Sequence, residues 1–187
     1  MPKFGHDTHS YVVSLQGGGV PVRLFRPRDV LQLTGLTSDQ RREWTVRRGL
    51  IQPDAPAQKR GSEAKFSWQT VLLLRLACVL RNRFHVELQA HRELLLAARQ
   101  ILGRVSFPGL WNTTLAIYDL RRCELLKNGD MRLKNEDVIV LHLDQHLAVL
   151  SEEFGLTDPV SQLPLFPVIA VRSERGRTVK AAKGSGR

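Results

Sequence analysis

The sequence predicts an α+β protein with a mainly helical N-terminal half and a small mixed C-terminal unit. Apolar residues recur at helical spacing between residues 28 and 83, whereas apolar and β-branched runs typical of strands occur at 113–118 and 137–143. With 187 residues and 42% apolar composition, the chain can bury a core without disulfides. Its two cysteines, Cys78 and Cys123, are therefore expected to be reduced thiols.

Positive charge is concentrated in two parts of the chain. Residues 22–83 carry thirteen Lys or Arg against five Asp or Glu, and residues 172–187 carry six against one. Residues 84–171 carry eight against eleven, so the formal net charge of +10 comes from the other two segments. Clustered positive charge indicates a polyanionic partner, whereas scattered charge would only keep a protein in solution.

The first 21 residues are predicted to be a flexible N-terminus or a short hairpin. Apolar and β-branched runs at 11–15 and 20–25 flank three consecutive glycines, residues 17–19. A hairpin and a flexible joint explain this pattern equally well. The glycines lack the spacing of a phosphate-binding loop, so nucleotide binding is not predicted.

Two short helices joined by a tight turn come next. The first covers residues 28–34 and is ended by Gly35, where a backbone with positive φ favours glycine. Ser38 or Thr37 caps the second helix, which runs to about Arg48. This is the layout of a helix-turn-helix, whose second helix enters the major groove of DNA.

A basic excursion follows the second helix. An apolar pair at 50–51 leads out, a polar tip spans 54–61, and an aromatic-bearing run at 64–68 leads back. This pattern predicts a two-stranded wing. Ser67 is then expected to cap a long core helix from Trp68 to about Arg83.

These features together resemble the winged helix-turn-helix of the MerR family of bacterial transcription regulators. The most specific are the turn Thr34-Gly35-Leu36 and the exit Arg48-Gly49-Leu50 before the wing. The resemblance covers residues 24–84, with one residue more than usual between Gly35 and Gly49, and it implies a DNA-binding dimer. The positions that match DNA contacts in the family are Gln40, Arg41, Arg42 and Arg47 on the second helix and Lys59, Arg60 and Lys65 on the wing; Ser38 completes the candidate set.

Residues 85–104 are predicted to form a connecting or dimerisation helix. Helical spacing continues from Phe84 to Leu102, and the sequence Phe107-Pro108-Gly109 breaks it. In the resembled family a longer helix at this place pairs with its copy. Here the helix either pairs in this way or packs on the C-terminal unit.

Residues 105–171 are predicted to form a small α+β unit. Strands are expected at 113–118 and 137–143, a hairpin turn at Asn128-Gly129-Asp130, and a helix at 145–154. The unit could be a sensor, a dimerisation unit or a partner-binding unit, so a protein partner or an effector remains open there. Residues 172–187 are expected to be a disordered basic tail.

No catalytic, cofactor or metal constellation is predicted. His142, Asp144 and His146 form the best metal candidate, but histidines at a strand-to-helix junction explain them more simply. No nucleophile elbow, phosphate loop or zinc signature of a deaminase occurs. We therefore expect no enzyme activity, no cofactor and no bound metal.

The predicted function is sequence-specific binding of double-stranded DNA by a homodimeric transcription regulator. Specificity is expected from Gln40 and from whichever of Arg41 and Arg42 is exposed. The expected location is cytoplasmic and nucleoid-associated, without membrane contact, because no apolar run approaches the roughly 20 residues that span a bilayer. The alternatives are a DNA-organising, excision or partition protein that assembles on repeated sites, and a protein-interaction adaptor.

Overall fold

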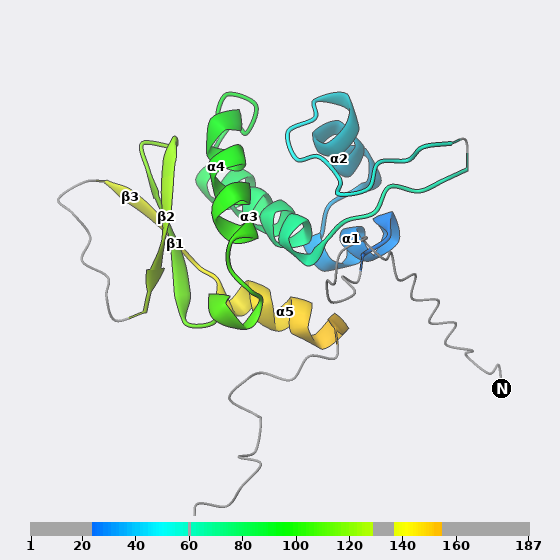
Figure 1. The fold of residues 1–187 in the computed structure, drawn as a ribbon. Coiled ribbons are helices and arrows are strands. Elements are labelled where there is room, and N and C mark those ends of the chain that lie inside the picture. Colours follow the sequence, from blue (N-terminus) through cyan, green and yellow to red (C-terminus); the bar gives the residue numbers. More distant parts are fainter. Residues whose placement is uncertain (1–23, 60, 129–136, 155–187) are drawn as a thin grey trace, which may run out of the picture.

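The computed structural model describes residues 24–59, 61–128 and 137–154 (Figure 1). Helices surround one long helix, α3, and a three-stranded antiparallel sheet lies at one end, so the predicted α+β class is confirmed. The predicted N-terminal hairpin, except Leu24 and Phe25, residues 155–171 of the predicted C-terminal unit and the basic tail lie outside the described residues. The elements are α1 (Pro27–Thr34), α2 (Ser38–Arg42), the π-helical turn η1 (Glu43–Arg47), α3 (Trp68–Phe84), α4 (Arg92–Gly103), the 3-10 turn η2 (Pro108–Leu110), β1 (Thr113–Tyr118), β2 (Arg122–Lys127), β3 (Val138–His142) and α5 (Asp144–Phe154).

The first two helices form as their capping residues predict. The backbone N–H of Arg26 donates to Oδ2 of Asp29 at 2.9 Å at the start of α1. Gly35 ends α1 with φ 70°, a left-handed conformation that glycine adopts without steric cost. Of the two predicted caps for α2, Thr37 is the one used, since its hydroxyl accepts from the N–H of Gln40 at 3.1 Å.

The second helix changes from α-helical to π-helical halfway along. The N–H of Arg48 donates to the carbonyl of Glu43 at 2.8 Å, five residues back. A π-helical turn holds one residue more than an α-helical turn. It turns both Trp44 and Thr45 inward, where they are 3% and 5% exposed.

The predicted two-stranded wing is an excursion, residues 52–65, whose ends are joined by single bridges rather than by long strands. Ala55 and Lys65 exchange two backbone hydrogen bonds, of 3.1 and 2.8 Å. Phe25 pairs in the same way with Phe66. The outgoing side of the excursion pairs through Ala55 and not through Leu50 and Ile51, which are buried in the core.

Helix α3 is the centre of the molecule. Ser67 caps it as predicted, accepting from the N–H of Thr70 at 3.3 Å. Nine of its 17 residues are buried, because α1, α4 and α5 all pack against it. Figure 1 shows α3 in the middle, with α1 and α2 on one side and α4 and the sheet on the other.

The predicted continuous helix from Phe84 to Leu102 is wrong. His85 ends α3 with φ 54°, and α4 begins only at Arg92. The break allows Val86 and Leu88, which are 7% and 5% exposed, to fold back onto the core. Burial of these side chains offsets the cost of a left-handed histidine.

The sheet has the strand order β2-β1-β3, and both neighbours run antiparallel to β1. The central strand β1 is buried at all six positions. The predicted turn at Asn128-Gly129-Asp130 lies, except for Asn128, outside the described residues. The strands before and after it, β2 and β3, both pair with β1 and not with each other. The turn between β1 and β2 is instead at Asp119 and Leu120, which have φ of 53° and 54°.

Helix α5 closes the fold by packing against α3. A single hydrophobic cluster therefore runs from Phe25 and Val30 in the helical half to Leu115 and Leu150 in the second half. No helix within the described ranges is long and apolar enough to cross a bilayer.

Candidate nucleic-acid interface

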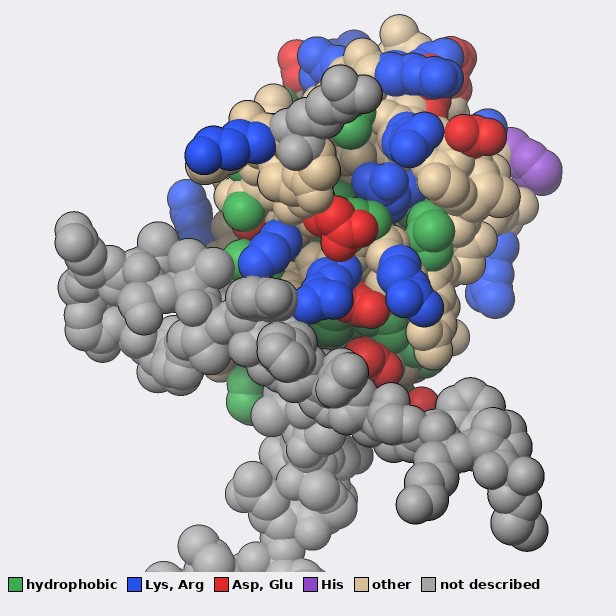
Figure 2. Space-filling model, turned by 90° about the vertical axis from the view of Figure 1, so that its right-hand side faces the viewer, with side chains coloured by type: hydrophobic (Ala, Val, Ile, Leu, Met, Phe, Trp, Pro, Cys, Tyr) green, Lys and Arg blue, Asp and Glu red, His purple; other side chains and the backbone are tan. Residues whose placement is uncertain are grey.

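The outer face of α2 and η1 carries three of the eight predicted DNA-binding residues. Ser38, Arg42 and Arg47 are exposed on it. Figure 2 shows the side of the molecule on which α1, α2 and the excursion lie, with basic side chains spread across it and a few acidic ones between them. This face offers cationic donors on a helix whose opposite side is buried.

Arg41 does not belong to that face. It is 8% exposed, its Nε has no hydrogen-bond partner among the described residues, and burial lowers its pKa, with a further contribution from Arg42. The cause is helical geometry, since Trp44 and Thr45 lie three and four residues on and face the core. Arg41 thus packs inward and is removed from the base-reading set, which leaves Arg42 as the exposed arginine of the pair.

Gln40 is partly committed to the start of its own helix. Its side-chain oxygen accepts from the N–H of Thr37 at 3.0 Å, and its own N–H donates to the hydroxyl of Thr37. The two residues form a capping box. The side-chain NH₂ of Gln40 is the group that stays available as a donor.

Glu43 neutralises part of the positive charge on η1. Arg48 donates to it in a short hydrogen bond, and Arg47 lies 3.5 Å from its other oxygen. The hydrogen bond from Arg48 is the main cause of the lowered pKa of Glu43. The side chain of Arg47 is still 69% exposed, so it extends toward solvent.

The excursion presents Lys59 at its tip. Lys59 is exposed, and its backbone is held by three hydrogen bonds with Ser62, which shape the turn. Lys65 is half-buried where it pairs with Ala55. Arg60 lies outside the described residues.

Three further arginines, none of them predicted as functional, join distant segments. Arg75 of α3 donates to the carbonyl of Leu33 in α1. Arg92 and Arg99 of α4 donate to the carbonyls of Arg48 and Gln52, and Arg99 also contacts Asp54 at 3.3 Å. Part of the positive charge counted in the sequence therefore holds the fold together. No local sequence signal indicates these contacts, because the partners are 42 to 47 residues apart.

One residue of the exposed face was missed by the charge-based prediction. Val46 is 67% exposed on η1, although it is a large aliphatic residue. It follows Arg42 by four residues and so lies near it on the same side of the helix. From the sequence alone, only the presence of an aliphatic residue between Thr45 and Arg47 in the predicted helix could have indicated this position.

The candidate metal residues do not converge. His142 is exposed, with Nδ1 3.2 Å from the hydroxyl of Thr114, whereas Asp144 accepts from the N–H of Asn112 at 2.7 Å. His146 is buried, and burial, helped by the charges of Arg75 and Arg83, lowers its pKa to about 4. Among the residues that the structure describes, no three potential ligand side chains form a metal-binding group.

The two cysteines are free and buried or half-buried. Burial raises the pKa of both Cys78 and Cys123 to about 11, so neither is a reactive thiolate near neutral pH.

No protein-family model matches the sequence, and no curated protein matches it significantly.

Proposed function

We propose that this protein binds double-stranded DNA sequence-specifically, as a homodimer, through a winged helix-turn-helix made of α1, α2–η1 and the excursion. In this proposal it regulates transcription in a bacterium or one of its mobile elements. The observation that carries the proposal is the pair of exposed arginines, Arg42 and Arg47, on the outer side of a helix that Trp44 and Arg41 anchor from within. The resemblance of residues 24–84 to the MerR family supports the same conclusion.

Arg42 is the residue proposed to read a base. Its guanidinium can donate two hydrogen bonds to the major-groove edge of guanine. Gln40 is less suited to the equivalent pairing with adenine, because that pairing needs the side-chain oxygen that the N–H of Thr37 already occupies. The exposed side chain of Val46 adds an apolar group of the kind that contacts a thymine methyl.

The remaining basic residues are proposed to bind phosphates. Lys59 at the tip of the excursion and Lys65 near its base lie on one segment, and Arg47 lies on η1, so together they can contact the DNA backbone from two sides of the helix in the groove. Such contacts bring affinity and salt dependence but no sequence information.

The homodimer is proposed because one helix-turn-helix usually needs a second half-site for useful affinity. Helix α4 has only 12 residues and buries Leu94, Leu95 and Leu102 within its own chain, which leaves little for a long antiparallel pair. Leu96 of α4 is 50% exposed. We expect the dimer contact to include Leu96 rather than the whole helix.

Selection of genomic DNA fragments by the purified protein, at two salt concentrations, tests the proposal. The expected result is an inverted-repeat motif that is recovered at both concentrations, with a spacing between half-sites that reports the dimer geometry. Recovery of sequence-blind fragments at low salt and of nothing at high salt would contradict it.

A double charge reversal, Arg42→Glu with Arg47→Glu, provides the decisive variant. The matched control is Arg121→Glu, at an exposed arginine in the turn between β1 and β2, on the opposite side of the molecule (Figure 1). We expect the double variant to lose the motif and the control to keep it. Long cooperative coverage by the wild type would instead indicate a protein that assembles on repeated sites.

A further inference from the structure

Helix α4 is bonded to both ends of the short segment that joins η1 to the excursion. At one end, Arg92 donates to the carbonyl of Arg48, the residue at which η1 stops. At the other end, Nη1 of Arg99 donates to the carbonyl of Gln52 at 2.7 Å. Arg92 and Arg99 are seven residues apart on one helix, about two turns or roughly 10 Å, so they lie on the same side of it. Helix α4 therefore fixes the distance between the end of η1 and the start of the excursion.

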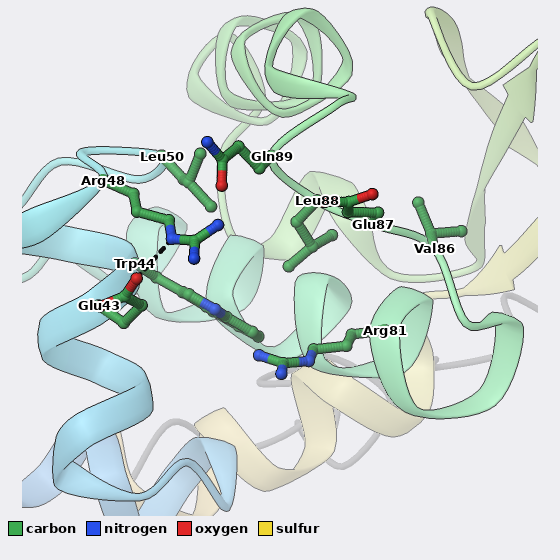
Figure 3. A pocket seen from close by; sticks show the side chains of 9 residues that line it. All are labelled: Glu43, Trp44, Arg48, Leu50, Arg81, Val86, Glu87, Leu88 and Gln89. Carbon is green, nitrogen blue, oxygen red and sulfur yellow. Dashed lines mark hydrogen bonds and ion pairs between the residues drawn. The ribbon is translucent and has the colours of Figure 1, made fainter.

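The bond to Arg48 completes a helix end. The last carbonyls of a helix have no donor within the helix, and an arginine side chain can supply one. The side chain of Arg48 is turned back to Glu43, as Figure 3 shows beside the pocket that both residues help to line. Arg92 thus supplies the donor for this carbonyl from another helix.

The carboxylate of Asp54 closes the base of the excursion. Its Oδ2 accepts from the backbone N–H of Ser67 at 2.7 Å, and its Oδ1 lies 3.3 Å from Nη2 of Arg99. Ser67 is the N-cap of α3, so Asp54 joins the outgoing side of the excursion to α3 and α4 at once. The side chains of Arg99 and Asp54 are 33% and 29% exposed, so water competes only in part for their ion pair. The bridge between Ala55 and Lys65 starts at the next residue, so Asp54 holds the excursion where it begins to project.

We propose that Asp54 and Arg99 are positioning residues for the phosphate contacts of the excursion. They hold it beside the second helix, so that Lys59 at the tip and the helix can reach DNA together. An excursion that is already held in place loses less conformational freedom on binding, which strengthens binding without adding a contact. The inference rests on the proposed DNA-binding function, because it concerns how that surface is assembled.

The variant Asp54→Asn separates positioning from charge. Asparagine has nearly the same shape, but only one of its two terminal atoms accepts hydrogen bonds, so it cannot serve both Ser67 and Arg99 as the carboxylate does. Removal of a negative charge should by itself strengthen binding to polyanionic DNA, whereas loss of positioning should weaken it. Glu63→Gln is the matched control, since Glu63 is an exposed carboxylate on the returning side of the excursion and is not bonded to Ser67 or Arg99.

Amide hydrogen exchange of the full-length protein without DNA, followed by NMR, gives the first measurement. The N–H groups of Ala55 and Lys65 should exchange about three- to tenfold faster in Asp54→Asn, because the bridge between them opens more often. The N–H of Leu76, which is buried in α3, should stay within about twofold, as should all three groups in Glu63→Gln. Unchanged exchange at the bridge, or equal acceleration at Leu76, would overturn the proposal.

The role of Arg99 is tested by the same exchange measurement. Arg99→Gln should accelerate exchange at Ala55 and Lys65 by a similar factor, because it removes the bonds to Gln52 and Asp54 together. Arg104→Gln is the matched control, since it removes the same charge from an exposed arginine directly after α4, and it should leave the exchange unchanged. Equal exchange in the two variants would overturn this role of Arg99.

Binding to the selected DNA motif gives the second measurement. Asp54→Asn should bind about three- to tenfold more weakly than the wild type, whereas Glu63→Gln should bind equally well or more tightly. Lys59→Ala should cost less affinity in the Asp54→Asn background than in the wild type, because a lysine that is no longer held in place contributes less. Tighter or unchanged binding by Asp54→Asn, or an equal cost of Lys59→Ala in both backgrounds, would overturn the proposal. Failure of the DNA-binding proposal would appear separately, as the absence of a motif in the fragment selection, since the exchange measurements contain no DNA.

Discussion

Helix α2 and strand β1 differ strongly in how many of their residues are buried. Of the five residues of α2 only Arg41 is buried, whereas all six residues of β1 are buried. The helix has a hydrophobic neighbour on one side only, while the strand is paired along both edges and covered by side chains on its faces. The difference indicates that the side chains of β1 serve the core, whereas those of α2 other than Arg41 remain at least partly open to solvent.

The charge distribution follows the same division. Residues 22–83 have a formal net charge of +8, and residues 84–171 have −3. Both regions nevertheless contribute to one hydrophobic cluster, because α1 and α5 pack on the same helix, α3. The contrast between the regions is therefore one of surface and not of core.

The largest effect is expected from removing the anchor of the helical region. Trp44→Ala should lower the free energy of unfolding by about 3–5 kcal/mol, since a buried aromatic side chain is replaced by a cavity. Because the core is shared, urea denaturation followed by circular dichroism should still show one cooperative transition. Leu143→Ala in the sheet region is the matched core variant and should also shift the whole transition. Two separate transitions in either variant would show that the regions fold independently.

Protonation of His146 should weaken the junction between the regions by up to about 3 kcal/mol, the energy equivalent of lowering its pKa from 6.5 to about 4. The folded-state pKa lies below the unfolded one, so this contribution is complete above pH 6.5 and is lost as the pH falls toward 4. Urea titrations at pH 7, 5.5 and 4 should show a larger loss for the wild type than for His146→Leu. Parallel losses in the two proteins would mean that other groups control acid stability.

Arg42→Ala should weaken binding to the selected DNA motif by about 1–3 kcal/mol and relax the preference at one base pair. The physical reason is the loss of the two proposed hydrogen bonds to a base edge. Binding to random DNA does not depend on these bonds. Competition binding with a library that varies each base pair in turn gives the measurement. Arg121→Ala, which removes the same charge from the sheet region, should leave both affinity and base preference unchanged.

The smallest effect is expected at the tip of the excursion. Lys59→Ala should reduce affinity for specific and random DNA by the same factor, roughly tenfold or less, and reduce the slope of log affinity against log salt by about one. A salt series of binding isotherms distinguishes this result from base reading. A loss confined to the specific site would assign Lys59 to base contact.

Local signals in the sequence were sufficient for much of the helical region. Gly35 required a positive φ and ended α1, and Ser67 capped α3, where the predicted end is within one residue of the observed one. Strand β1 also has the predicted bounds, because its apolar and β-branched run is short and continuous. In each case the interactions that decide the structure lie within a few residues.

The turn between β1 and β2 shows where such signals fail. The Asn128-Gly129 pair has the strongest hairpin signature in the region. The hairpin of β1 and β2 nevertheless turns at Asp119 and Leu120, which have positive φ, and β3 pairs with β1 rather than with β2. Strand order depends on which distant segments bury their faces together, and leucine at positive φ gives no sequence signal. The same argument applies to His85, which interrupts the predicted continuous helix so that Leu88 can reach the core.

For the candidate site, the sequence by itself determined a basic helix after the Gly35 turn, with an excursion beside it. Only the tertiary structure decided that Arg41 packs inward and Arg42 outward, since the rotation of a short helix is set by the core it packs against. It also decided that Arg75 and Arg99 bind carbonyls of distant segments. The number of charged residues follows from the sequence alone. Whether a given arginine can bind a partner depends on whether its N–H donors already form hydrogen bonds within the folded chain.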